Sequence, residues 1–208
     1  MVQKNKEGFC QDLKLAGLLV EHPDQYFTQG PLIVTAGQLQ SCQIFFDSAA
    51  DKEKTFDRAI GFLDALQSEI TNQAAVVVLE ELFMNATIDA PKEAQRKGLQ
   101  PNKKQCEFYL CHDENTLQIS CSDPYGSLDL KKLLARMDEV YRKGAGEAIN
   151  FDGAGGAGIG CYLLFEQCKT LIIGVRPGLQ TKVSCLIPLK MSRRRKSEIS
   201  KSLHSFES

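Results

Sequence analysis

The sequence predicts a single α/β domain with short tails. At 208 residues and 43% hydrophobic content, the chain can bury one substantial core but is short for two enzyme domains. Runs rich in β-branched and aromatic residues, such as 42–46 and 170–175, are typical of strands. Other runs, such as 128–142, carry an apolar stripe at helical spacing and are typical of amphipathic helices.

The first half of the chain is expected to form two strands and two helices. β-Branched and aromatic residues predict strands at 31–36 and 42–46. Apolar residues at helical spacing then predict a helix over 52–70. A break at Thr71 and Asn72 follows, and Asn72 can cap a second, apolar helix that runs on to residue 86.

The second half is expected to contain two hairpins and two helices. A four-residue loop between apolar runs predicts the first hairpin, and Gly144 is placed to end the amphipathic helix. The expected elements are strands at 106–111 and 116–121, helices at 128–142 and 162–166, and strands at 170–175 and 181–189.

Composition also predicts three less ordered regions around and within the domain of residues 31–190. Residues 1–30 are expected to form an irregular N-terminal extension with one short segment packed on the domain. Residues 191–208 are basic and serine-rich, which predicts a disordered tail. The basic stretch 91–104 is expected to be a solvated surface loop, with a flap near phosphates or a partner-docking surface as the alternative.

Several classes of protein are disfavoured by charge and composition. A formal net charge of −1 gives no global attraction to nucleic acid or to anionic membrane. No apolar run reaches the length of a membrane span and no signal-type core follows the start, so a cytoplasmic protein is expected. Eight cysteines form no CxxC pair, which favours free thiols over a zinc site, and three scattered histidines give no support to a catalytic triad.

Four short motifs stand out in a fixed order along the chain. Glu81 and Asn85 are four residues apart, so on a helix the carboxylate and the carboxamide share one face. Such a pair can hold a divalent cation and orient a water. The motif is followed by Asp123 with Gly126, by a glycine-rich run at 153–160, and by Gly178-Leu179-Gln180-Thr181.

This succession of ExxxNA, DxxG, GxGxG and GxxT resembles the histidine-kinase-like (GHKL, Bergerat-fold) ATPase domain of gyrase-type topoisomerases and sensor histidine kinases. The chain is most similar to the anti-sigma-factor serine kinases, because the domain is short and begins with a strand and a long helix. The resemblance spans roughly residues 43–189. It implies an α/β two-layer sandwich, in which a mixed, mostly antiparallel sheet is covered on one face by helices that enclose the nucleotide.

The resemblance implies that Asp123 and Thr181 read the adenine of ATP. The carboxylate of Asp123 would accept a hydrogen bond from the exocyclic amine, while the hydroxyl of Thr181 would donate one to a ring nitrogen. Glycines beside them, including Gly126, would let the backbone approach the nucleotide because they carry no Cβ.

The resemblance assigns the phosphate end of the site to the other two motifs. Asn85 would bind Mg²⁺ through its amide oxygen, and Glu81 would act as general base on water or on a substrate serine. The phosphate cradle would be formed by Gly156, Gly158 and Gly160, with a helix starting after Gly160. ATP and Mg²⁺ are therefore the expected cofactors. The implied partner is a regulatory protein of the sigma-factor or antagonist type, and a homodimer is possible in this family.

Two alternatives remain open. The usual DxGxG box is altered here, because Pro124 and Tyr125 stand where the first glycine and its neighbour would be. A domain that has lost the chemistry and acts as a partner-switching binding module fits this departure. In addition, residues 153–158 satisfy GxGxxG, the dinucleotide fingerprint of oxidoreductases, although the next strand ends without an acidic residue for the ribose.

Overall fold

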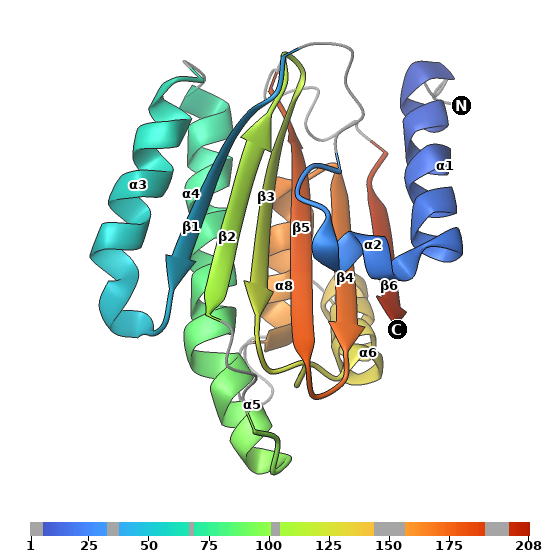
Figure 1. Ribbon diagram of the computed structural model, residues 1–208. Helices are drawn as coiled ribbons and strands as arrows, with labels where there is room; N and C mark the ends of the chain where they lie inside the picture. The colour runs from blue at the N-terminus through green and yellow to red at the C-terminus, as the bar shows by residue number, and fades with distance from the viewer. Residues whose placement is uncertain (1–5, 33–37, 67–68, 101–104, 144–156, 190–199) are drawn as a thin grey trace.

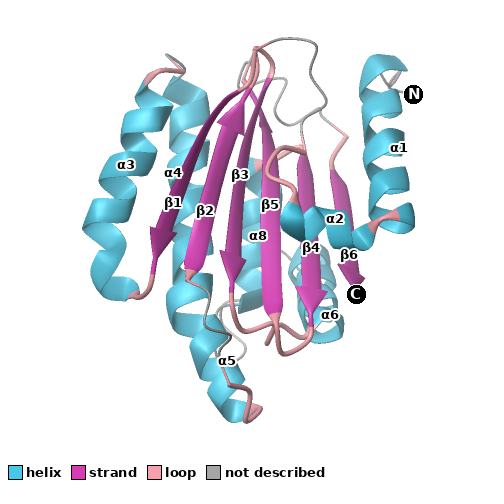
Figure 2. Ribbon diagram, in the orientation of Figure 1, coloured by secondary structure: helices cyan, strands magenta, loops and turns pink. Residues whose placement is uncertain are grey.

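The computed structural model describes residues 6–32, 38–66, 69–100, 105–143, 157–189 and 200–208. These residues form an open β-sheet with helices on both faces (Figures 1 and 2). The strands are β1 (Gln40–Phe46), β2 (Cys106–His112), β3 (Thr116–Asp123), β4 (Thr170–Arg176), β5 (Gln180–Pro188) and β6 (Ser202–Glu207).

The sheet has the strand order β1-β2-β3-β5-β4-β6. Every pairing is antiparallel except that of β4 with β6, which is parallel. The predicted α/β class and the mixed, mostly antiparallel sheet are therefore confirmed. Both expected hairpins are also present, because β2 pairs with β3 and β4 pairs with β5.

The larger helical layer covers one face of the sheet (Figure 2). Alternate strand residues such as Ile44, Phe108 and Ile119 point into this layer and are almost fully buried, as the period of two along a strand requires. Leu79 and Phe83 face them from α4. The helices of this layer are α3 (Lys52–Asp64), α4 (Glu69–Met84) with a following π-helical turn (Asn85–Asp89), α5 (Ala90–Arg96), α6 (Leu130–Lys143) and α8 (Ala157–Gln167).

The opposite face carries the N-terminal helices α1 (Lys6–Glu21) and α2 (Pro23–Thr28) over β4 and β6 (Figure 1). The expectation of an irregular extension is therefore wrong for residues 6–28, and helices cover part of both faces of the sheet. The extension is held by a second apolar cluster. Its buried members are Leu15, Leu19, Tyr26, Phe27, Leu32 and Ile172. Five of these six residues precede β1, whereas Ile172 comes from β4, so the cluster joins distant parts of the chain and no local pattern reveals it.

Tyr26 anchors α2 to the sheet through its phenol group. The side chain is fully buried, and its Oη lies 3.1 Å from the carbonyl oxygens of Ile172 and Lys182 and 3.0 Å from the hydroxyl of Ser184. Lys182 is also buried and holds α2 from the sheet side. Its Nζ donates to the carbonyl oxygens of Tyr26 and Gln29 at 2.8 Å each. Burial lowers the pKa of Lys182 to about 8.

A Tyr26→Phe substitution is expected to lower the free energy of unfolding by about 1–3 kcal/mol, because it leaves buried acceptors of the sheet without their donor. Urea denaturation of the two proteins measures this difference. Tyr141→Phe is the matched control, since Tyr141 is 73% exposed and should change stability by less than about 0.5 kcal/mol. Equal effects of the two substitutions would contradict the anchoring role of Tyr26.

The C-terminal residues also differ from the expectation. The tail was expected to be disordered, but Ser202–Glu207 form β6 along β4, with Leu203 paired to Leu171 and Phe206 to Gly174. The ring of Phe206 packs edge-on against Tyr26 with 5.3 Å between centroids. Tertiary contacts therefore order a segment whose composition alone predicts disorder.

Three smaller expectations also need correction. The helix expected over 52–70 ends at Asp64, and α4 begins at Glu69, so the break precedes Thr71 and Asn72. The stretch expected as a loop from residue 91 begins as α5, with Pro91 in its first turn, where proline is tolerated. The strand expected at 31–36 lies largely outside the described residues.

Candidate functional site

Asp123 and Thr181 meet at one end of the sheet. They are directly paired across β3 and β5, and both are buried. Burial raises the pKa of Asp123 to about 6, although hydrogen bonds from the backbone of Tyr125, Gly126 and Thr181 oppose the shift. The Thr181 hydroxyl faces the carboxylate and lowers its pKa, yet it makes no hydrogen bond of normal geometry. A buried acceptor and a buried hydroxyl thus lie side by side at this end of the sheet.

Gly126 joins this pair to the turn between β4 and β5. Its φ is +56°, a conformation that L side chains rarely adopt, and its carbonyl oxygen accepts from the N–H of Gly178 at 3.1 Å. A Cβ at this position would lie 2.0 Å from the carbonyl oxygen of Arg176. The DxxG and GxxT motifs, which are far apart in sequence, are therefore in direct backbone contact, and the contact requires glycine at position 126.

Glu81 and Asn85 lie on the helical layer, where α4 passes into the π-helical turn. Glu81 is half-buried, and burial together with the nearby carboxylates of Asp89 and Glu80 raises its pKa. Asn85 opens the π turn, also half-buried. Asp89 was not predicted as a site residue, although its position four residues after Asn85 puts it on the same helical face.

The glycine-rich run meets Glu81 at Gly160. A Cβ at Gly160 would lie 2.5 Å from Oε2 of Glu81, so the carboxylate rests against the bare backbone of α8. Gly158 lies in the first turn of the same helix, which begins at Ala157 rather than after Gly160 as expected. Gly156 lies outside the described residues. The structure therefore brings the ExxxNA motif and the end of the glycine-rich run together.

The two halves of the site are linked through β3 and the π turn, which are in contact. The Sγ of Cys106 donates to the carbonyl oxygen of Ala86 in this turn at 3.8 Å, and the Sγ of Cys121 donates to that of Leu82 at the same distance. Asn85 is therefore held near the end of β3 at which Asp123 lies. The spacing of Cys106 and Cys121 matches no zinc template, and the sequence pattern gives no sign of these two contacts.

A cavity of about 350 Å³ opens on the opposite face of the sheet. It lies between α2 and the ends of β1, β2 and β3, and Asp123 and Pro124 contribute to its wall. Glu81, Asn85 and Thr181 do not line it. The remaining lining residues are Phe27, Thr28, Phe45, Gln105, Glu107, Ser122, Arg176, Leu179 and Gln180.

Oxygen donors, rather than sulfur or imidazole, are available for a cation at the candidate site. The side chains of Glu81, Asn85 and Asp89 all carry oxygen, which suits a hard cation such as Mg²⁺. Among the described residues, no group of three or more His, Cys, Asp or Glu side chains that could hold a metal ion is present. Seven cysteines are free thiols: Cys42, Cys106, Cys111, Cys121, Cys161, Cys168 and Cys185. None of the helices in the described ranges is long and apolar enough to cross a membrane.

No model of a protein family matches the chain, and no curated protein matches its sequence. Any functional assignment therefore depends on the geometry described above.

Proposed function

We propose that this chain is a Mg·ATP-binding regulatory domain with the Bergerat arrangement, of the anti-sigma-factor serine kinase type. The proposal is carried by the pairing of Asp123 with Thr181. These two residues are separated by a long stretch of sequence, yet they lie opposite each other and are both buried, with the Thr181 hydroxyl facing the Asp123 carboxylate. An adenine placed there would donate its exocyclic amine to the carboxylate and supply a ring nitrogen for the hydroxyl.

The contact between Glu81 and Gly160 supports a phosphate end beside the base end. In this proposal the triphosphate lies near the first turn of α8, where free N–H groups favour an anion. Asn85, with its amide oxygen, would hold the Mg²⁺ that neutralises the phosphates. Bound Mg²⁺ would supply charge stabilisation for phosphoryl transfer.

Glu81 is suited to act as the general base of this site. Burial and the neighbouring carboxylates raise its pKa, which makes the carboxylate a stronger proton acceptor than a solvated glutamate. It would take the proton from an attacking water or from the hydroxyl of a substrate serine. A regulatory protein of the sigma-factor or antagonist type is the partner that this reading implies, in the cytoplasm.

A second candidate, a partner-switching module without catalysis, is favoured by the altered aspartate box. The N–H of Tyr125 donates to Oδ1 of Asp123 at 2.9 Å, so one carboxylate oxygen already accepts a hydrogen bond from the turn that follows it. Proline at position 124 removes a further backbone donor. Such a domain would keep the fold and bind a protein partner while holding ATP weakly or not at all.

Titration with Mg·ATP is expected to raise the thermal unfolding midpoint of the protein, and Asn85→Ala is expected to abolish most of the rise. A ligand bound only by the native state adds about 2.7 kcal/mol of stability at a hundred times its Kd. Differential scanning fluorimetry with and without EDTA measures the effect. Asn115→Ala is the matched control, because Asn115 is exposed in the β2–β3 loop on another part of the sheet.

An unchanged unfolding midpoint at millimolar Mg·ATP would exclude nucleotide binding. The partner-switching module would then be the remaining candidate. If the midpoint rises, phosphate release and serine phosphorylation should then be compared between the native protein and Glu81→Ala. Activity that is lost in the variant identifies an enzyme, whereas ATP binding without turnover identifies a switch.

A further inference from the structure

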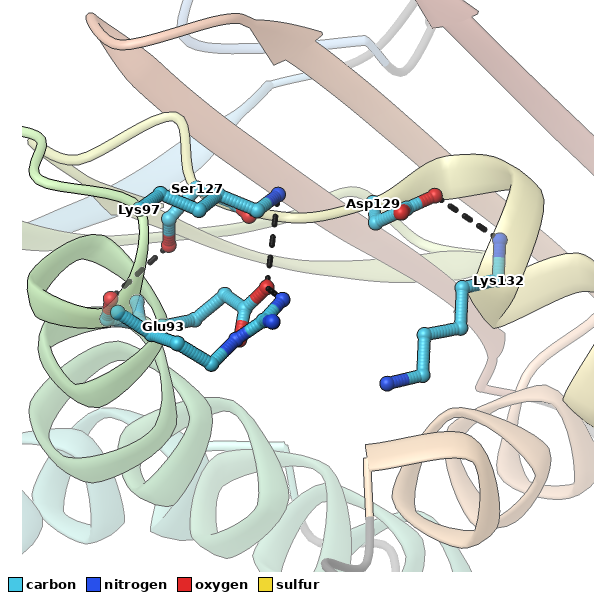
Figure 3. Close-up of polar contacts among 7 residues, drawn as sticks. Glu93, Lys97, Ser127, Asp129 and Lys132 are labelled. Atoms are coloured by element: carbon cyan, nitrogen blue, oxygen red, sulfur yellow. Dashed lines mark hydrogen bonds and ion pairs between the residues drawn. The ribbon is translucent and has the colours of Figure 1, made fainter.

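Ser127 is fastened to α5 by two hydrogen bonds that run in opposite directions (Figure 3). The Nζ of Lys97 donates to the carbonyl oxygen of Ser127 at 2.7 Å. The Oγ of Ser127 in turn donates to the carbonyl oxygen of Ala90, the first residue of α5, at 2.9 Å. Ser127 is only 1% exposed, so its end of both bonds is buried, whereas the side chain of Lys97 is partly exposed. We refer to these three residues, Ala90, Lys97 and Ser127, as the α5 latch.

The ammonium group of Lys97 is also oriented by Glu93. The two charged groups lie 3.5 Å apart, and Glu93 is held from its other side by Arg96, whose Nε donates to Oε2 at 2.8 Å. These cations lower the pKa of Glu93 to about 2, so the carboxylate stays ionised over the whole physiological range. Arg96 itself makes no described contact with Ser127, which makes it a natural control for Lys97.

The latch lies between the two halves of the candidate site. On one side, Ser127 directly follows Gly126. The carbonyl oxygen of Gly126 accepts a hydrogen bond from the N–H of Gly178, beside the pair of Asp123 and Thr181 that is proposed to bind the base. On the other side, α5 continues from the π turn that begins with Asn85. The segment after the latch leads into α6, where Oδ1 of Asp129 caps the N–H of Lys132 at 3.0 Å (Figure 3).

We infer that Lys97 is a positioning residue, which holds the base-reading end of the site at a fixed distance from the helix that carries Asn85. This inference rests on the proposed function for its ligand, but the latch itself is a property of the protein without nucleotide. Mg·ATP must contact both halves at once, whereas adenosine contacts only the base-reading half. A fixed distance between the halves therefore favours Mg·ATP over adenosine. Once the base is bound, the phosphates and Mg²⁺ meet a half that is already in place, so little further conformational entropy of the protein is lost.

Three variants test the latch. Lys97→Met keeps the aliphatic stem and loses the bond to Ser127, Ser127→Ala loses the bond to Ala90, and the double variant loses both. Arg96→Met, the control, removes a neighbouring cation from Glu93 and leaves the latch intact. Affinities for Mg·ATP and for adenosine are measured by isothermal titration calorimetry for each protein.

Lys97→Met is expected to weaken Mg·ATP binding about tenfold, as the loss of one charge-assisted hydrogen bond predicts, with adenosine affinity unchanged within about twofold. Arg96→Met should alter neither affinity by more than about twofold. A purely structural role of Lys97 would lower both affinities together and leave their ratio unchanged. That result, or no change in either affinity, would overturn the inference.

Amide hydrogen exchange of the nucleotide-free proteins separates this inference from the proposed function. In Lys97→Met, and more strongly in the double variant, the amides of α5 and of the first turn of α6 are expected to exchange at least about tenfold faster, while those of β2 and β3 keep their rates. If the native protein binds neither nucleotide, the proposed function fails, and a faster exchange would still establish the latch. If exchange is the same in Lys97→Met and Arg96→Met, the latch is overturned whatever the nucleotide result.

Discussion

Gly126→Ala is expected to lower the free energy of unfolding by at least about 3 kcal/mol. Two costs add at this position. A non-glycine residue with positive φ costs on the order of 1 kcal/mol or more, and the new Cβ would lie 2.0 Å from the carbonyl oxygen of Arg176. Because the carbonyl oxygen belongs to the backbone and the backbone also fixes the position of a Cβ, relief requires the β4–β5 turn to move away from β3. Chemical denaturation, followed by circular dichroism, measures the loss.

Gly61→Ala is the matched control for this substitution. Gly61 lies inside α3, and a Cβ there meets no atom within 4 Å. Alanine at an open helical position should raise stability by about 0.5–1 kcal/mol. A loss of less than about 1 kcal/mol in Gly126→Ala would show that the junction between the DxxG and GxxT motifs is not as tight as the structure indicates.

Asp123→Asn is expected to weaken Mg·ATP binding by about ten- to a hundredfold, because the exocyclic amine of adenine would lose a charged acceptor and meet the amide of asparagine instead. The native protein should also bind Mg·ATP more weakly as the pH falls through about 6, where Asp123 takes up a proton. Fluorescence titration at several pH values measures both effects. A pH-independent affinity, or unchanged affinity in the variant, would contradict the role of Asp123 in reading the base.

Stability without nucleotide should show the opposite dependence on pH. The pKa of Asp123 is about 6 in the folded protein and 3.8 in its ordinary environment, so between these values the native state binds the proton more tightly than the unfolded state. The contribution of this group to the free energy of unfolding therefore rises by up to about 3 kcal/mol as the pH falls from 7 to 4. Asp123→Asn should lack this contribution, and the difference between the two proteins across this pH range isolates it.

Much of the architecture could be predicted from local patterns. The hairpins formed by β2 with β3 and by β4 with β5 are marked by β-branched runs with short loops between them, and α6 is marked by its apolar stripe. These signals are local, since each depends on residues a few positions apart. Motif order also singled out Asp123 and Thr181, and the structure pairs them across two strands.

The features that could not be predicted depend on distant residues. In the sequence, Tyr26 is one residue of a polar segment with no sign of a special role. Its hydrogen bonds to the carbonyl oxygen of Lys182 and to the hydroxyl of Ser184 exist only in the folded protein. Residues 202–207 have no strong strand pattern, and they become a strand because β4 offers an open edge. Similarly, Lys97 belongs to a basic stretch that predicts a solvated loop, and only the tertiary fold shows that its ammonium group reaches Ser127.

The second apolar cluster has a kinetic consequence. The phenol of Tyr26 bonds to Ser184 across 158 positions of sequence, and its ring also meets Phe206. Contacts of such high sequence separation form only after the intervening chain has been ordered. We therefore expect α1, α2 and β6 to dock late in refolding and to detach together as one cooperative subunit of the native state. During synthesis, the N-terminal helices would then dock on the sheet only after β6 has been made.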